Sequence, residues 1–128
     1  MLADDDYDIR MILESIIQSF GFDVTCAENG SRALELYELA DGRFDLLLTD
    51  ICMPKMNGCE LIRAIRQQDQ QFPIIAITGF TDLDIIKELE PYHVRLFEKP
   101  INFKALHTYI DALHIGQPDS ETYGAPAI

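Results

Sequence analysis

The sequence predicts an α/β domain of the doubly wound type, in which helices cover both faces of a five-stranded parallel sheet. Three observations support this prediction: five short apolar runs occur along the chain, a helical repeat of apolar residues follows each run, and turn-forming residues separate the two kinds of segment. Continuous apolar runs are typical of strands buried on both faces, and their alternation with helices is typical of a parallel sheet. The chain has 128 residues, of which 48% are hydrophobic, enough for one core.

The five expected strands are short, and the first is the shortest. The first lies almost at the start of the chain and contains only three residues before a run of aspartates. The others are longer and rich in branched or aromatic residues, as strands usually are. The expected strands cover residues 1–3, 22–27, 44–49, 73–78 and 94–97.

The first two expected helices follow from apolar spacing. In the first helix, apolar residues recur three, four and seven positions apart and form one face, which ends before Gly21. The second begins at Gly30 and Ser31, ends near Asp41 and Gly42, and turns Ala33, Leu34 and Tyr37 inward. The face of the first helix comprises Ile9, Ile12, Leu13, Ile16, Ile17 and Phe20.

Capping residues mark the other three helices. Asn57 with Glu60 three positions on predicts the start of the third, and Thr81 with Asp84 the start of the fourth. Asn102 is expected to cap the fifth. The inward residues of these helices are Leu61, Ile62 and Ile65, then Leu83, Ile86 and Leu89 before Pro91, and finally Leu106, Tyr109, Ile110 and Leu113.

The charge of the chain excludes several functions. With 22 acidic and 10 basic residues, the formal net charge is −12, which argues against direct nucleic-acid binding and against adhesion to an anionic membrane.

No apolar run is long enough to span a membrane, and the start of the chain does not resemble a secretory signal, so we expect a cytoplasmic domain. The three cysteines have no metal-finger spacing and are expected to be free thiols.

Polar and charged residues follow four of the expected strands. Asp4 and Asp5 follow the first strand, Asp50 the third, Thr78 the fourth and Lys99 the fifth. Ligands of open parallel sheets bind at the carboxyl ends of the strands. Two carboxylates about 4 Å apart repel by roughly 4 kcal/mol at an effective dielectric constant near 20. A divalent cation would offset this repulsion, and all-oxygen ligands favour Mg²⁺, with Mn²⁺ as an alternative.

Asp50 is the candidate nucleophile of this cluster. A carboxylate can accept a phosphoryl group as an aspartyl phosphate, with a metal ion and Lys99 neutralising the transferred oxygens and the Thr78 hydroxyl donating to one of them. Each of these residues taken alone has a simpler structural role, and an aspartate after a strand is commonly a helix cap. Their joint placement at successive strand ends is what predicts a site.

Four segments resemble the receiver domain of two-component response regulators, which has the CheY-like fold. They are residues 2–10 (LADDDYDIR), 47–58 (LLTDICMPKMNG), 75–79 (IAITG) and 97–100 (FEKP). The resemblance implies the strand order 2-1-3-4-5, a receiver domain over residues 1–115, and a tail or linker over residues 116–128. It also implies that Asp50 is phosphorylated by a sensor histidine kinase or a histidine phosphotransfer protein.

The resemblance further assigns roles to individual residues. Asp5 and Asp50 would bind Mg²⁺ directly together with the backbone carbonyl of Cys52, and Asp4 would bind it through a water molecule. Thr78 and Lys99 would hold the phosphoryl oxygens.

The same resemblance gives roles to two more residues near the site. A cis peptide bond before Pro100 would aim the preceding lysine. Gly58 would be required because its backbone adopts a conformation that a β-carbon penalises.

The resemblance also implies a signalling switch rather than an enzyme. Phosphorylation would alter the surface around the fourth helix, the fifth strand and the fifth helix, where an effector domain, a downstream protein or a second copy of the chain would bind. The family often has Phe or Tyr three residues before the lysine, and this chain has Leu96 there.

Three other functions have sequence requirements that can be compared with this chain. An aspartate-nucleophile phosphatase would need a second aspartate at the position of Cys52, and a flavodoxin-like binder would need a phosphate loop where this chain has three aspartates. A degenerate receiver that serves only for docking remains the main alternative.

Overall fold

The computed structural model describes residues 1–79 and 83–113 and confirms the predicted architecture. Its five strands form one parallel sheet in the order β2-β1-β3-β4-β5. The strands are β1 (Leu2–Ala3), β2 (Cys26–Ala27), β3 (Leu47–Asp50), β4 (Ile74–Thr78) and β5 (Arg95–Glu98). The helices are α1 (Tyr7–Ser19), α2 (Gly30–Leu39), α3 (Gly58–Gln68), α4 (Leu83–Leu89) and α5 (Phe103–Ala112), and a 3₁₀ turn, η1 (Glu90–Tyr92), follows α4.

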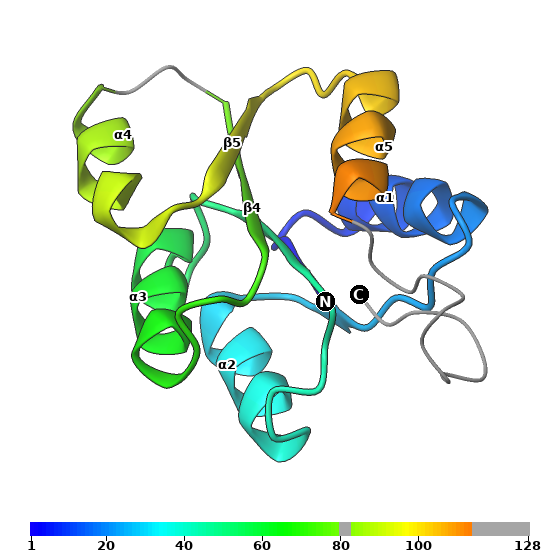
Figure 1. The fold of residues 1–128 in the computed structure, drawn as a ribbon. Helices are drawn as coiled ribbons and strands as arrows, with labels where there is room; N and C mark the ends of the chain where they lie inside the picture. Colours follow the sequence, from blue (N-terminus) through cyan, green and yellow to red (C-terminus); the bar gives the residue numbers. More distant parts are fainter. Residues whose placement is uncertain (80–82, 114–128) are drawn as a thin grey trace.

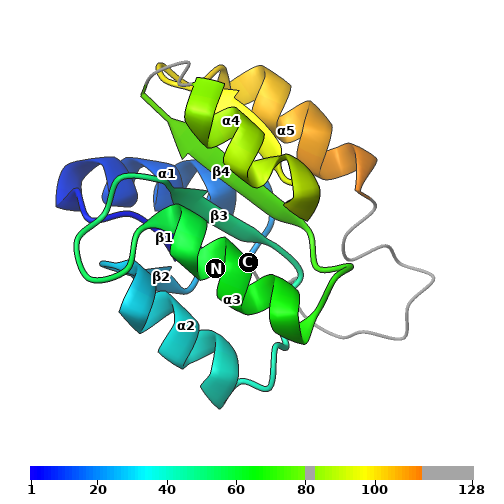
Figure 2. The ribbon, with the colours of Figure 1, turned by 90° about the vertical axis from the view of Figure 1, so that its left-hand side faces the viewer.

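Helices cover both faces of the sheet (Figures 1 and 2). Helices α1 and α5 lie on one face, and α2, α3 and α4 lie on the other. Successive strand residues alternate between two hydrophobic clusters: Leu47 packs on the α2–α3 side, whereas Leu48 packs on the α1–α5 side. This alternation follows from the two-residue period of a strand, and it explains why the strands read as continuous apolar runs.

Side-chain caps begin several helices, and those at Asn57 and Asn102 were predicted from the sequence. Asp6 accepts hydrogen bonds from the backbone N–H groups of the first turn of α1, and Asn102 caps α5. Asn57 and Glu60 form a complete capping box at α3. Asn29 caps α2, a role that the sequence analysis missed. The predicted cap Thr81 lies outside the described residues, as do the expected domain end at residue 115 and the tail over residues 116–128.

The predicted faces and strands were wrong in places. Strand β2 comprises only Cys26–Ala27 instead of residues 22–27, although Phe22 is buried. Ile12 is 55% exposed and Leu83 is 66% exposed, although both were expected to face the core. Each helix meets the sheet along a narrow stripe, centred in α1 on Leu13 and Ile17, so residues at the margin of an apolar face stay uncovered.

Within residues 1–79 and 83–113, no helix is long and apolar enough to span a membrane.

Candidate functional site

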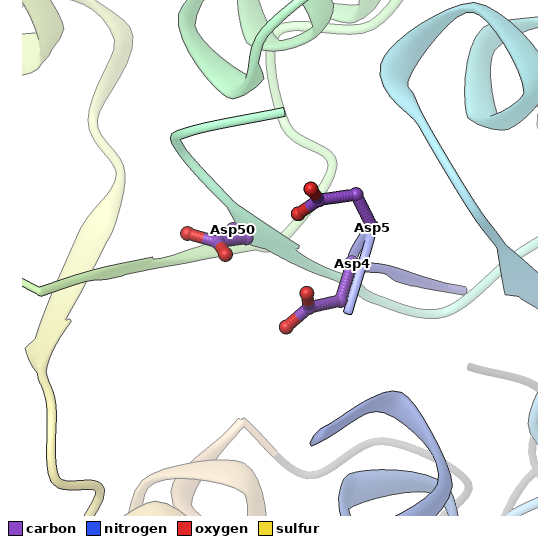
Figure 3. Close-up of side chains that lie close together, drawn as sticks. All are labelled: Asp4, Asp5 and Asp50. Carbon is purple, nitrogen blue, oxygen red and sulfur yellow. The ribbon is translucent and has the colours of Figure 1, made fainter. Parts of the chain in front are cut away.

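The register of the sheet brings the predicted aspartates together. Ala3 of β1 pairs with Thr49 of β3, so that Asp4 and Asp50, which follow these residues, lie at the same edge. One carboxylate oxygen from each of Asp4, Asp5 and Asp50 lies within 4.8 Å of the other two. Figure 3 shows the three side chains converging from the ends of β1 and β3. The prediction that these carboxylates form one cluster is therefore confirmed.

Both carboxylate oxygens of Asp50 accept hydrogen bonds. Its side chain is almost fully buried, with 6% of the residue surface exposed. Oδ1 accepts a hydrogen bond of 2.7 Å from the backbone N–H of Ile51, and Oδ2 accepts one of 3.1 Å from the ammonium group of Lys99. These contacts fix the orientation of the Asp50 carboxylate beside a positive charge.

Asp4 is the most deeply buried acid of the cluster, with 1% of its surface exposed. Burial raises the pKa of Asp4, a hydrogen bond from the Asp6 N–H opposes this shift, and the charge of Asp50 adds to it, so that the net shift is upward. The guanidinium group of Arg10 donates to the backbone carbonyl of Asp4 at 2.7 Å. Since its ionised form is disfavoured, Asp4 would gain from a neighbouring cation.

Lys99 supplies the positive charge opposite the aspartates. Burial alone lowers the pKa of Lys99, but the hydrogen bond to Asp50 and the charges of Asp50 and Asp4 outweigh it, and the net shift is upward. Its backbone N–H donates to the carbonyl of Thr78 at 2.8 Å, which ties the ends of β4 and β5 together. The peptide bond between Lys99 and Pro100 is cis, as the resemblance implied.

Thr78 and Cys52 lie on neighbouring segments. Thr78 ends β4 and is largely buried, and its backbone accepts the bond from Lys99. Cys52 is exposed on the loop that follows β3. All three cysteines are free, as predicted. The proposed metal-binding role of the Cys52 carbonyl stays a prediction.

The loop between β3 and α3 is packed backbone against backbone. Gly58 donates its N–H to the carbonyl of Ile51 at 2.8 Å, and a β-carbon on Gly58 would lie 2.3 Å from the backbone oxygen of Asp50. Gly58 is thus required by close approach, and the predicted reason was wrong, because the positive φ angles of this loop occur at Lys55 and Met56.

The loop also contacts the start of α2, which the sequence analysis did not foresee. The N–H groups of Gly30 and Ser31 donate to the carbonyls of Met56 and Lys55 at 3.1 and 3.0 Å. A β-carbon on Gly30 would lie 2.1 Å from the Met56 oxygen. A glycine at the start of a predicted helix is the only sequence signal of this contact. Helix α2 therefore supports the loop that follows Asp50.

Comparison with known proteins shows the family of the chain. Residues 1–111 match the profile of the response regulator receiver domain. The chain is 35% identical over 116 residues to the response regulator receiver protein CpdR of Brucella abortus (strain 2308), which covers 90% of this chain and 95% of CpdR. It is 36% identical over 114 residues to the transcriptional regulatory protein CpxR of Escherichia coli (strain K12), covering 88% of this chain but 47% of CpxR.

Solved structures show the same fold. The chemotaxis protein CheY4 of Vibrio cholerae aligns with a TM-score of 0.77 and 28% identity over 88% of this chain and 94% of its own. Fold and sequence similarity together define an α/β domain of the signalling class. The chain belongs to the response regulator receiver domains of two-component systems.

Proposed function

We propose that Asp50 accepts a phosphoryl group from a phosphohistidine of a sensor histidine kinase or a histidine phosphotransfer protein. The observation that carries the proposal is the convergence of three carboxylates with Lys99 bound to Asp50 at 3.1 Å. An Asp50 carboxylate oxygen would attack phosphorus, the nitrogen–phosphorus bond would break, and its electron pair would return to the imidazole. The products are an aspartyl phosphate and an unphosphorylated histidine.

The site fits Mg²⁺, with Mn²⁺ as an alternative ion, because its clustered donors are hard carboxylate oxygens. Asp5, Asp50 and the carbonyl of Cys52 would bind the ion directly, and Asp4 would bind it through water. When bound, the ion would neutralise the phosphoryl oxygens during transfer.

Two residues would hold the transferred group. The Lys99 ammonium group, now paired with Asp50, would pair with a phosphoryl oxygen, and the Thr78 hydroxyl would donate to another.

Exposed apolar residues beside the site support a protein donor. Tyr7, Met11 and Ile12 of α1 and Phe103 of α5 are exposed. A groove of about 220 Å³, lined by Ile9, Ile12, Leu13, Lys99, Pro100, Ile101 and Phe103, lies between α1 and the segment after β5. Such apolar surface marks protein contacts, and Lys99 joins the groove to the phosphoacceptor site. We infer that the phosphohistidine partner docks here.

The output surface is proposed to lie around α4, β5 and α5. Thr78 would move toward the phosphoryl group, and this movement would shift the population of two states of that surface. An effector domain, a downstream protein or a second copy of the chain would bind there. Leu96 occupies the position where an aromatic switch residue is common, so we expect Thr78 to act without an aromatic partner at that position.

The proposal predicts phosphorylation by a small acyl-phosphate donor. With Mg²⁺ and acetyl phosphate, intact mass spectrometry should show a gain of one phosphoryl group, and a chelator added beforehand should prevent it. Absence of labelling at saturating donor and metal would overturn the proposal and favour a docking-only receiver.

Mg²⁺ should also raise the midpoint of thermal unfolding, because a ligand that binds only the folded state stabilises it. At a concentration one hundred times its Kd, the gain is about 2.7 kcal/mol. Asp5→Asn should sharply reduce the shift at the same concentration, and since Asp5 is exposed this change should leave the metal-free midpoint nearly unaltered. Equal shifts in both proteins would exclude Asp5 as a ligand.

A further inference from the structure

A second concave site lies near the amino-terminal ends of β4 and β5. Asp50 lies at the opposite end of the sheet, where β3 ends. Helix α3 begins beside Asp50, and its later turns contact the link between α4 and β5, where Arg66 donates to the carbonyl of Tyr92. Between them is a pocket of about 430 Å³. Its lining includes Arg63, Arg66, Gln67, Gln70, Tyr92 and His93, which we name the arginine pocket.

The arginine pocket is lined by hydrogen-bond donors in a strongly acidic chain. Two of the ten Lys and Arg residues line it, together with glutamines, a tyrosine and a histidine. No Asp or Glu is among the residues that line it in the described part of the chain. The residues that line the pocket therefore carry a net positive charge in a protein whose net charge is −12.

Arg66 is held rigidly at this pocket. Only 9% of its surface is exposed. Its Nε donates to the carbonyl of Tyr92 at 2.8 Å, and its Nη1 donates to the carbonyls of Asp69 at 3.1 Å and Phe72 at 2.6 Å. These three bonds fix the plane of the guanidinium group, which removes much of the entropic cost of orienting it toward a ligand.

The charge of Arg66 is only partly compensated. Among residues 1–79 and 83–113, no carboxylate forms an ion pair with it within 4.0 Å. Burial lowers the pKa of Arg66, and the charge of Asp69 offsets this in part. A buried cation that has only carbonyl partners gains from a nearby anion.

Arg63 can add a second positive charge. Its guanidinium group lies 3.6 Å from the carboxylate of Glu88, and both side chains are nearly half exposed. Exposed pairs of this kind are weak, so Arg63 can exchange Glu88 for an anion in the pocket.

We propose that the arginine pocket binds a small phosphate monoester. The Nη2 group of Arg66, which forms none of the three bonds above, and the guanidinium group of Arg63 can donate to phosphate oxygens, and the glutamine amides offer further donors. The volume of about 430 Å³ lies in the usual range of small-molecule pockets. The bound ester would bridge α3 and the link into β5, the strand that leads to Lys99. This site is independent of phosphoryl transfer at Asp50.

The test is a titration of the ¹⁵N-labelled protein with AMP, and separately with inorganic phosphate, without Mg²⁺ and at constant ionic strength. Saturable chemical-shift changes are expected at the amides of residues 66–70 and 92–93. Arg63→Gln should weaken binding about tenfold, since one charge-assisted bond is lost. Arg32→Gln is the matched control, because Arg32 pairs with Glu35 on α2 and should leave the affinity unchanged.

Three outcomes would overturn the proposal. One is no saturable change with either probe up to about 20 mM, beyond the range of a specific weak site. Another is changes confined to residues around Asp50. The last is an equal loss of affinity in Arg63→Gln and Arg32→Gln, which would indicate attraction to charge in general. Saturation by AMP with a tenfold loss in Arg63→Gln alone would support it.

Discussion

Replacement of Asp50 by Asn should abolish the gain of one phosphoryl group from acetyl phosphate and Mg²⁺. The amide lacks the negative charge and the nucleophilic oxygen of the carboxylate. It can still accept the hydrogen bond from the Ile51 N–H, and the change relieves the repulsion between Asp50 and its neighbouring carboxylates, so the fold should be retained. Intact mass gives the labelling, and circular dichroism checks the fold.

Asp8→Asn is the matched control for this experiment. Asp8 is an exposed acid in the first turn of α1, close in sequence to the cluster but not one of its members. The Asp8 variant should be labelled to the wild-type level. Labelling of Asp50→Asn at that same level would place the acceptor on another residue, which peptide mapping would then identify.

The fold was predictable from the sequence because apolar runs report burial. They indicated a parallel α/β sheet, and the strand order came from resemblance to a family. The runs did not report hydrogen bonding: Phe22 is buried beside the sheet, yet β2 begins only at Cys26. Strand lengths at the edge of a sheet depend on the neighbouring strand, and a single run cannot show this.

The charged site was predictable for a related reason. In a parallel sheet, the residue after each strand reaches the same edge, so Asp4, Asp50 and Lys99 could be placed together before their contacts were seen. The bond from Arg10 to the carbonyl of Asp4 and the packing of Gly30 on Met56 could not be placed in this way. They depend on how closely separate segments approach, which the spacing of residue types does not encode.

Gly58→Ala should destabilise the protein by about 3 kcal/mol, the upper range of overpacking costs. Gly58 is the first residue of α3, where alanine would otherwise favour the helix, so the sign of the effect is informative. The added β-carbon would lie 2.3 Å from the backbone oxygen of Asp50 and 2.8 Å from the Cα of Ile51, and neither backbone atom can turn aside as a side chain can. Urea unfolding measures the change in free energy.

Gly79→Ala separates this steric effect from the general effect of replacing glycine. A β-carbon on Gly79 meets no atom of residues 1–79 and 83–113 within 4 Å, and the φ angle of Gly79 is not positive, so the substitution should be neutral or stabilise by about 0.5 kcal/mol through the unfolded chain. Because the Gly58 contact falls on Asp50 itself, Gly58→Ala should also slow labelling by acetyl phosphate under conditions where the variant is fully folded. Equal stability of the two variants would show that the loop after Asp50 yields to the β-carbon, and that close packing does not fix the acceptor.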